Sequence, residues 1–81
     1  MQLITRTETG GYEAWRSDFD DQAERQGRAG LSLLQIWRDL DAPDTVLLLF
    51  EATDRDRAEA YLKEREQMGH GLGAATFLAT A

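Results

Sequence analysis

Residues 45–51 read Thr45-Val46-Leu47-Leu48-Leu49-Phe50-Glu51, an apolar run with β-favouring ends and no alternation of apolar and polar side chains. A strand with one face in water alternates, so this pattern predicts a strand that is buried on both faces. The rest of the chain has room for only two helices, which cover one face of a small sheet. We therefore expect another copy of the molecule to cover the second face.

The chain is short and contains no cysteine. Its 81 residues predict one domain spanning residues 1–81. A domain of this size buries only about 60% of its unfolded surface, and dimerisation would supply further burial. The absence of cysteine excludes a disulfide framework, a thiolate metal site and a cysteine nucleophile.

The charge pattern argues against nucleic acid as a partner. The formal charge is −6, with nine basic residues interleaved among fifteen acidic ones, whereas a nucleic-acid binder concentrates Lys and Arg on one surface. The first residues do not form a signal peptide, and no apolar run approaches about 18 residues, so we expect a cytoplasmic protein without a membrane span. Five acidic residues predict a solvated helix face rather than a metal site: Glu13, Asp18, Asp20, Asp21 and Glu24.

Hydrophobic periodicity predicts six elements in the order β-α-β-β-α-β. The expected strands span residues 2–8, 31–38, 45–51 and 75–80, and the expected helices span residues 12–28 and 55 to 67 or 68. Asp54 is the expected N-cap of the second helix, and Gly69 or Gly71 is expected to end it. This order predicts an α+β, ferredoxin-like fold with a four-stranded antiparallel sheet and both helices on one face.

The two central strands predict which side chains share a face. With residues 39–44 as the loop, the expected cross-strand pairs are Trp37 with Val46, Gln35 with Leu48, and Leu33 with Phe50. The opposite face is then purely aliphatic and is assigned to the helices, with Leu34, Ile36, Leu47 and Leu49. We assign the mixed face, with its aromatic residues and Gln35, to the partner subunit. A slip of one residue in the loop would reverse the pairing.

Several short motifs resemble a known family. They are Tyr12-x-x-Trp15-x-x-x-Phe19, Ala29-Gly30-Leu31, Trp37-Arg38-Asp39, Asp41-x-Pro43-Asp44, Phe50-Glu51, and Asp54 with Ala58. With these motifs the chain resembles the dimeric α+β barrel superfamily, in particular its antibiotic-biosynthesis monooxygenase branch and the small bacterial proteins described as cyclase-like. The resemblance implies a homodimer in which two sheets face each other to form a barrel, with the helices outside.

The resemblance also implies a range of activities. Some members are oxygenases that act on electron-rich aromatic polyketides without metal or flavin, some are cyclases that shape polyketide chains, and many have no established activity. Such enzymes often carry a histidine near the end of the second helix within a longer segment. This chain differs there, because its histidine lies in the glycine-rich segment Met68-Gly69-His70-Gly71-Leu72-Gly73.

His70 is the natural candidate for a catalytic acid or base, because histidine alone has an unperturbed pKa near neutrality. The alternative is an exposed histidine in a loop. The glycines around it do not predict a phosphate-binding loop, because such loops open a helix after a strand and this segment closes a helix before a strand.

Aromatic side chains are the candidates for ligand binding. Tyr12, Trp15 and Trp37 would line a cavity for a planar ligand, or they fill the core and the dimer interface. We expect the three phenylalanines to fill the core and the dimer interface, because phenylalanine has no polar group with which to orient a ligand. Arg38 would hold a carboxylate or phenolate of the ligand, or it pairs at the surface with Asp39, Asp41 or Asp44.

The sequence favours a cofactor-independent enzyme of small-molecule metabolism, monooxygenase- or cyclase-like, with an aromatic or polyketide-like substrate. The substrate would lie against Tyr12, Trp15 and Trp37, with His70 or a tyrosine moving protons. The alternative is a non-catalytic homodimeric module that binds a small ligand or assists a neighbouring enzyme. An apolar cavity of about 300 Å³ with convergent polar groups favours an enzyme or ligand binder, and a filled core favours a structural role.

Overall fold

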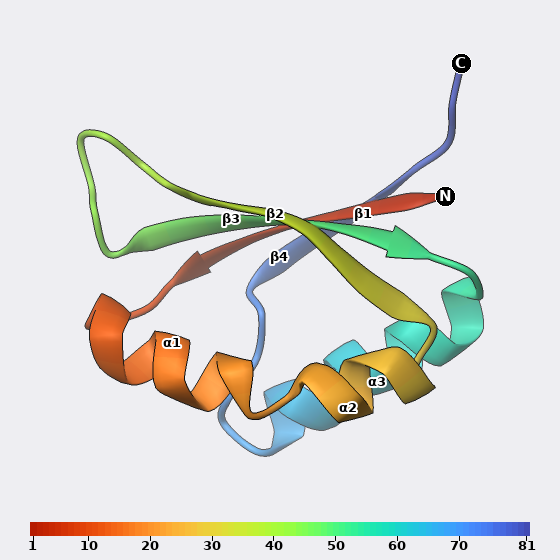
Figure 1. Ribbon diagram of the computed structural model, residues 1–81, viewed down its shortest axis with the longest axis horizontal. Helices are drawn as coiled ribbons and strands as arrows, with labels where there is room; N and C mark the ends of the chain where they lie inside the picture. Colours follow the sequence, from red (N-terminus) through yellow and green to blue (C-terminus); the bar gives the residue numbers. More distant parts are fainter.

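The computed structural model describes all 81 residues, which fold into two layers. Four strands form the sheet, and three helices lie together on one side of it (Figure 1). The elements are β1 (Gln2–Glu8), α1 (Tyr12–Asp20), α2 (Ala23–Arg28), β2 (Leu31–Arg38), β3 (Thr45–Ala52), α3 (Arg55–Gln67) and β4 (Ala74–Leu78). The strands are all antiparallel in the order β2-β3-β1-β4, which is compatible with a ferredoxin-like fold. The predicted α+β class and sheet are thus confirmed.

The first predicted helix is two helices rather than one. α1 ends at Asp20 and α2 begins at Ala23, with a tight turn in which the Gln22 N–H donates to the carbonyl of Phe19 at 3.0 Å. Two consecutive aspartates, Asp20 and Asp21, are the central residues of this turn, and aspartate is a poor residue for a helix interior. The prediction of one continuous helix over residues 12–28 was therefore wrong.

The helix α3 begins and ends as expected. The carboxylate of Asp54 accepts the N–H of Arg57 at 3.0 Å, as an N-cap does. At the other end, Gly69 has φ +78°, its N–H donates to the carbonyl of Glu66 at 3.0 Å, and the His70 N–H donates to that of Arg65 at 2.9 Å. These two bonds form a Schellman motif, which reverses the chain and brings His70 back toward the helix layer.

A β-bulge displaces the pairing of β2 with β3. Leu33 lies opposite Phe50, as predicted, but the register shifts by one residue between Leu33 and Gln35. Beyond the shift, Trp37 lies opposite Leu47 instead of Val46. The bulge inserts one unpaired residue into β2, and that single residue changes every later pair. The predicted pairs that are wrong for this reason are Trp37 with Val46 and Gln35 with Leu48.

The predicted assignment of the two sheet faces is also wrong. Val46, Leu48 and Phe50 are fully buried beneath the helices, whereas Leu47 and Leu49 are only partly buried on the other face. The helix-covered face includes Phe50 because Phe50 pairs with Leu3 and packs with Phe19 of α1. Successive side chains of a strand point to opposite faces of the sheet. Because residues 46, 48 and 50 face the helices, the aliphatic residues 47 and 49 point away from them.

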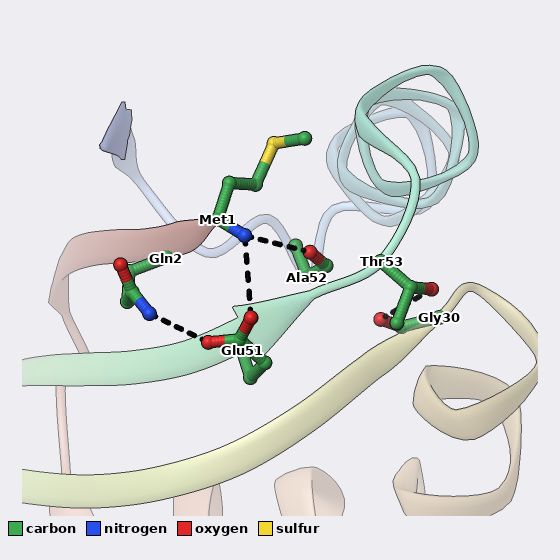
Figure 2. Close-up of polar contacts among 6 residues, drawn as sticks. All are labelled: Met1, Gln2, Gly30, Glu51, Ala52 and Thr53. Carbon is green, nitrogen blue, oxygen red and sulfur yellow. Dashed lines mark hydrogen bonds and ion pairs between the residues drawn. The ribbon is translucent and has the colours of Figure 1, made fainter. Parts of the chain in front are cut away.

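The core lies between the sheet and the helix layer, and two glycines allow the chain to close around it. Gly30 has φ +75° and lies before β2. Its carbonyl accepts hydrogen bonds from the N–H (3.0 Å) and the hydroxyl (3.3 Å) of Thr53, which lies beside it (Figure 2). A Cβ at position 30 would meet the Thr53 side chain. Gly73 (φ +77°) lies so close to the carbonyl of Arg6 that it leaves no space for a Cβ.

The sheet is tied together at the start of β1 by one acidic side chain. Glu51 accepts a hydrogen bond from the Gln2 side-chain amide at 2.6 Å and from the Met1 amino group at 3.2 Å (Figure 2). The amino group also donates to the carbonyl of Ala52 at 3.3 Å. These contacts are partly or wholly solvent-exposed, so they align the strand ends and add little stability. No helix of the fold is both long and apolar enough to cross a membrane.

Candidate functional site

A cavity of about 290 Å³ opens on the helix side of the sheet, and we call it the helix-side cavity. It lies between α1, the C-terminal half of α3, the end of β1 and the loop of residues 69–72. Its chemically informative lining residues are Trp15, Asp18, Gln22, Tyr61, Arg65 and His70. His70, the predicted catalytic acid or base, and Trp15, a predicted ligand-binding residue, therefore line the same cavity.

Three charged or titratable groups converge at the cavity. The Arg65 guanidinium donates from Nη2 to Asp18 Oδ2 at 2.9 Å, and His70 Nδ1 lies 3.7 Å from the same oxygen. The side chain of Arg65 is only 5% exposed, whereas that of His70 is 54% exposed. A buried guanidinium needs a charged partner, so Asp18 is held in place by Arg65 and presents its carboxylate to His70.

The position of Asp18 corrects the interpretation of the acidic helix face. The sequence predicted that this residue would be one of five solvated carboxylates, but it forms an ion pair with Arg65 of α3, 47 residues away in the sequence. Arg65 lies on the inner stripe of α3, together with the buried Ala58 and Tyr61. A charged residue on an otherwise apolar helix stripe is the sequence signal that points to this pair.

Aromatic rings form two walls of the cavity. Trp15 stacks on Phe19 with ring centroids 4.9 Å apart and an interplanar angle of 17°. Phe19 continues into the core, while Trp15 remains at the cavity surface. Tyr61 of α3 supplies the other ring, and burial raises the pKa of its phenol, an effect that Gln26, Arg65 and Arg25 partly offset. The Tyr61 hydroxyl is therefore a neutral donor at physiological pH.

Three buried polar atoms of the lining residues have no hydrogen-bond partner. They are the Tyr61 hydroxyl, Gln22 Oε1 and Arg65 Nε. The Gln26 amide nitrogen, which lies near enough to lower the Tyr61 pKa, is also outside hydrogen-bonding geometry. Leaving such a group unpaired costs about 1–3 kcal/mol, so buried polar atoms are normally hydrogen-bonded. All three lining atoms are shielded from solvent, so a ligand in the cavity reaches them only after a side-chain rotation. Sequence reasoning did not identify Gln22, although Gln22 and Gln26 continue the buried stripe that begins at Phe19.

Tyr12 and Arg38 meet at the other end of α1. The guanidinium carbon of Arg38 lies 3.9 Å from the centroid of the Tyr12 ring, a cation–π contact. Arg38 Nε also donates to the carbonyl of Pro43 at 2.8 Å, and the Tyr12 hydroxyl accepts a hydrogen bond from Arg16 at 3.1 Å. None of the three neighbouring aspartates forms an ion pair with Arg38, because its guanidinium lies over the Tyr12 ring instead.

Trp37 lies apart from the other predicted ligand-binding residues. It pairs with Leu47 on the face of the sheet that carries no helix, and it is 44% exposed. The structure thus brings His70 and Trp15 together at the cavity. Tyr12 lies beside Trp15, with ring centroids 6.0 Å apart, but outside the cavity lining, and Arg38 lies over the Tyr12 ring. Trp37 alone lies on the opposite side of the sheet.

No protein-family model, curated protein or solved structure matches this chain. Its histidine and acidic side chains also form no group of three that could hold a metal ion. The functional interpretation therefore depends on the geometry of the helix-side cavity.

Proposed function

We propose that this protein is a cofactor-independent enzyme of small-molecule metabolism, monooxygenase- or cyclase-like, whose aromatic or polyketide-like substrate binds in the helix-side cavity. The observation that supports this most directly is the convergence of His70, Asp18 and Arg65 on a space walled by Trp15 and Tyr61. Its volume, about 290 Å³, is just below the range of small-molecule sites, which starts at about 300 Å³. Aromatic walls with a few polar groups suit a small planar ligand.

The first chemical step in this proposal is removal of a proton by His70. The Asp18 carboxylate favours a proton on Nδ1, so the lone pair of Nε2 is left free to act as a base toward the ligand. The separation of 3.7 Å exceeds a hydrogen bond, and a rotation of the half-exposed His70 would close it. Catalytic hydrogen bonds are commonly long before a ligand binds.

The negative charge left on the substrate would be stabilised by the donors of the cavity. Arg65 Nε and the Tyr61 hydroxyl are both buried and unpaired. A side-chain rotation on ligand binding would turn them toward the substrate, and such donors act strongly where water is excluded. In the oxygenase version, the substrate carbon is a CH₂ group and its carbanion adds O₂ to give a hydroperoxide. Loss of water from the hydroperoxide, with the second hydrogen of that carbon, leaves a C=O group, so the substrate supplies all four electrons, one oxygen atom enters the product and the other leaves as water. In the cyclase version, the carbanion attacks a carbonyl carbon of the same molecule. Both versions begin with the same proton transfer.

Binding is tested first, with Trp15 as the reporter. The chain has two tryptophans, so a Trp37→Phe background leaves Trp15 alone. We expect naphthols and aromatic β-diketones to quench its fluorescence in a saturable manner, because the ring of Trp15 lies at the cavity surface. Failure of the entire panel to quench Trp15 would contradict the proposed substrate class.

Turnover is tested in the same background by oxygen uptake and by mass spectrometry of the products. His70→Gln should leave ligand affinity within about twofold and lower the rate by about a hundredfold or more, the usual contribution of a general base. Asp18→Asn should give a smaller loss, because it misorients the base without removing it. Asp21→Asn is the matched control, since Asp21 is exposed and lines no cavity. Equal rates for His70→Gln and the control would exclude His70 as the base.

The second candidate function is a non-catalytic homodimeric module that binds a small ligand or assists another enzyme. It is favoured by the single histidine, which stands 54% exposed and beyond hydrogen-bond distance of Asp18. Saturable quenching of Trp15 without turnover of any bound ligand would identify this function.

For either function we propose a homodimer formed through the sheet face that carries no helix. That face, which we call the open face, has an apolar centre formed by Ile4, Trp37, Leu47 and Leu49. Pairing of two such faces would give the dimeric α+β barrel, with the helices outside. The test belongs to the whole molecule and is described in the Discussion.

A further inference from the structure

A second concave surface lies between α2 and α3, and we call it the arginine groove. Its volume is about 480 Å³, and it is lined by Arg25 and Arg28 of α2 and by Arg57, Tyr61 and Glu64 of α3, among others. The two helices lie in the same layer beneath the sheet (Figure 1). The groove is distinct from the helix-side cavity, and Tyr61 is the residue that lines both.

The charge of the groove is opposite to that of the chain. The protein has a formal charge of −6 and only nine basic residues, yet three guanidiniums face a single carboxylate, Glu64, in this lining. Like charges close together on a helix surface repel each other, so such a gathering is unfavourable without an anion. An acidic protein with this local concentration of arginine therefore has a surface suited to an anionic ligand.

The groove arginines are available for binding. Arg25 and Arg57 take part in no ion pair or side-chain hydrogen bond, and Arg28 pairs only with Glu24 of its own helix. That pair is exposed on both sides, so an incoming anion can replace it at little cost. Arg55 of α3, by contrast, is already engaged with Glu59 at 2.8 Å.

The arrangement of the three side chains indicates the class of anion. Arg25 and Arg28 are three residues apart and share one face of α2, while Arg57 reaches the groove from α3. One carboxylate is satisfied by a single bidentate arginine, whereas a phosphate group offers several oxygens and a higher charge. We propose that the arginine groove binds a small phosphate-bearing anion, a diphosphate or a phosphate monoester. This inference is independent of the chemistry at His70.

Diphosphate is the probe, and the full chain is titrated with it while the arginine side-chain N–H signals and the heat of binding are followed. We expect shifts at Arg25, Arg28 and Arg57 that sodium chloride of equal ionic strength does not produce. The double variant Arg25→Gln/Arg57→Gln should weaken binding about tenfold or more, because it removes two charge-assisted contacts. Both residues are exposed, so the variant should keep the circular dichroism spectrum and melting temperature of the parent.

Arg55→Gln is the matched control, because Arg55 lies on α3 near Arg57 but outside the groove. It should change the affinity by less than about twofold, as a lost surface ion pair does. An equal loss in the control and in the double variant would overturn the proposal, as would identical shifts with sodium chloride. A tricarboxylate such as tricarballylate, at matched ionic strength, tests the ligand class. Tighter binding of diphosphate supports phosphate recognition, and equal or tighter binding of the tricarboxylate would overturn it.

Discussion

At the scale of single residues, Tyr61 links burial to stability. Its hydroxyl is buried and has no hydrogen-bond partner, so replacing it by hydrogen removes an unsatisfied polar group. We expect Tyr61→Phe at pH 7 to leave the free energy of unfolding unchanged or to raise it by up to about 1 kcal/mol. Urea denaturation measures the difference. A loss of more than about 2 kcal/mol would mean that the hydroxyl is hydrogen-bonded in the folded protein.

The same residue predicts how stability responds to alkaline pH. Burial raises the pKa of Tyr61 above its ordinary value of 10.0, so the folded state favours the neutral phenol. The stability that depends on the neutral Tyr61 phenol is complete below about pH 10. It is lost as the pH rises through the folded-state pKa, because the unfolded state releases the phenol proton first. Tyr61→Phe should lose less stability than the parent over that range in parallel urea titrations. Tyr12→Phe is the control and should keep the alkaline loss, since it retains Tyr61.

Replacing two glycines by alanine should change the stability of the protein in opposite directions. Gly27 lies inside α2, and a Cβ there meets no atom within 4 Å, so Gly27→Ala should stabilise the protein by about 0.5–1 kcal/mol. Gly73 has φ +77° and faces the carbonyl of Arg6, so Gly73→Ala should destabilise the protein by more than about 1 kcal/mol. Thermal melts of the two variants test the pair. Equal melting temperatures would contradict the different roles assigned to these glycines.

At the scale of elements, local signals were sufficient for most of the fold. The N-cap at Asp54, the end of α3 at Gly69 and the four strands follow from short-range patterns, and the structure confirms them. The bulge after Leu33 does not follow from such patterns. One inserted residue has no signature in an apolar run, yet it moves Trp37 from the predicted pair with Val46 to Leu47. The assignment of faces was wrong because it depended on that register.

The candidate site was predictable only in part, for a related reason. His70 was identified by residue type, since it is the single histidine of the chain. Its neighbours Asp18 and Arg65 come from different helices, and nothing in the spacing of two residues so far apart indicates that they form a pair. Arg65 was visible as a charge on the buried stripe of α3. A buried charge requires a carboxylate partner, but the sequence does not indicate which of the fifteen acidic residues supplies it.

At the scale of the whole molecule, one face of the sheet has no layer of helices over it. The protein measures 31 × 30 × 18 Å, a flat body of one sheet and one helix layer. All three helices lie on the same side, so the open face is covered by nothing in its own chain (Figure 1). Trp37 at 44% exposed and the partly buried Leu47 and Leu49 make that face apolar. Such a patch on a small domain is typical of an interface between subunits.

Three leucines in and beside β3 allow the dimer to be tested with one type of substitution. Leu49 belongs to the open face, Leu48 is fully buried beneath the helices, and Leu40 in the β2–β3 loop is 99% exposed. Leu49→Asp should give a folded monomer, because it places a charge in the interface without touching the core. Leu48→Asp should unfold the protein, since a buried unpaired carboxylate costs more than a domain of this size can offset.

Leu40→Asp should change neither folding nor assembly, because its side chain is already in water. Sedimentation velocity gives the oligomeric state of each variant, and circular dichroism gives its folding. The unaltered protein should sediment as a dimer, and a well-folded monomer at micromolar concentration would contradict the proposal. A folded dimer for Leu49→Asp would contradict it as well, because two facing aspartates at the centre of an apolar interface repel each other and lose their hydration. The effect of Leu49→Asp therefore decides whether the open face is the dimer interface.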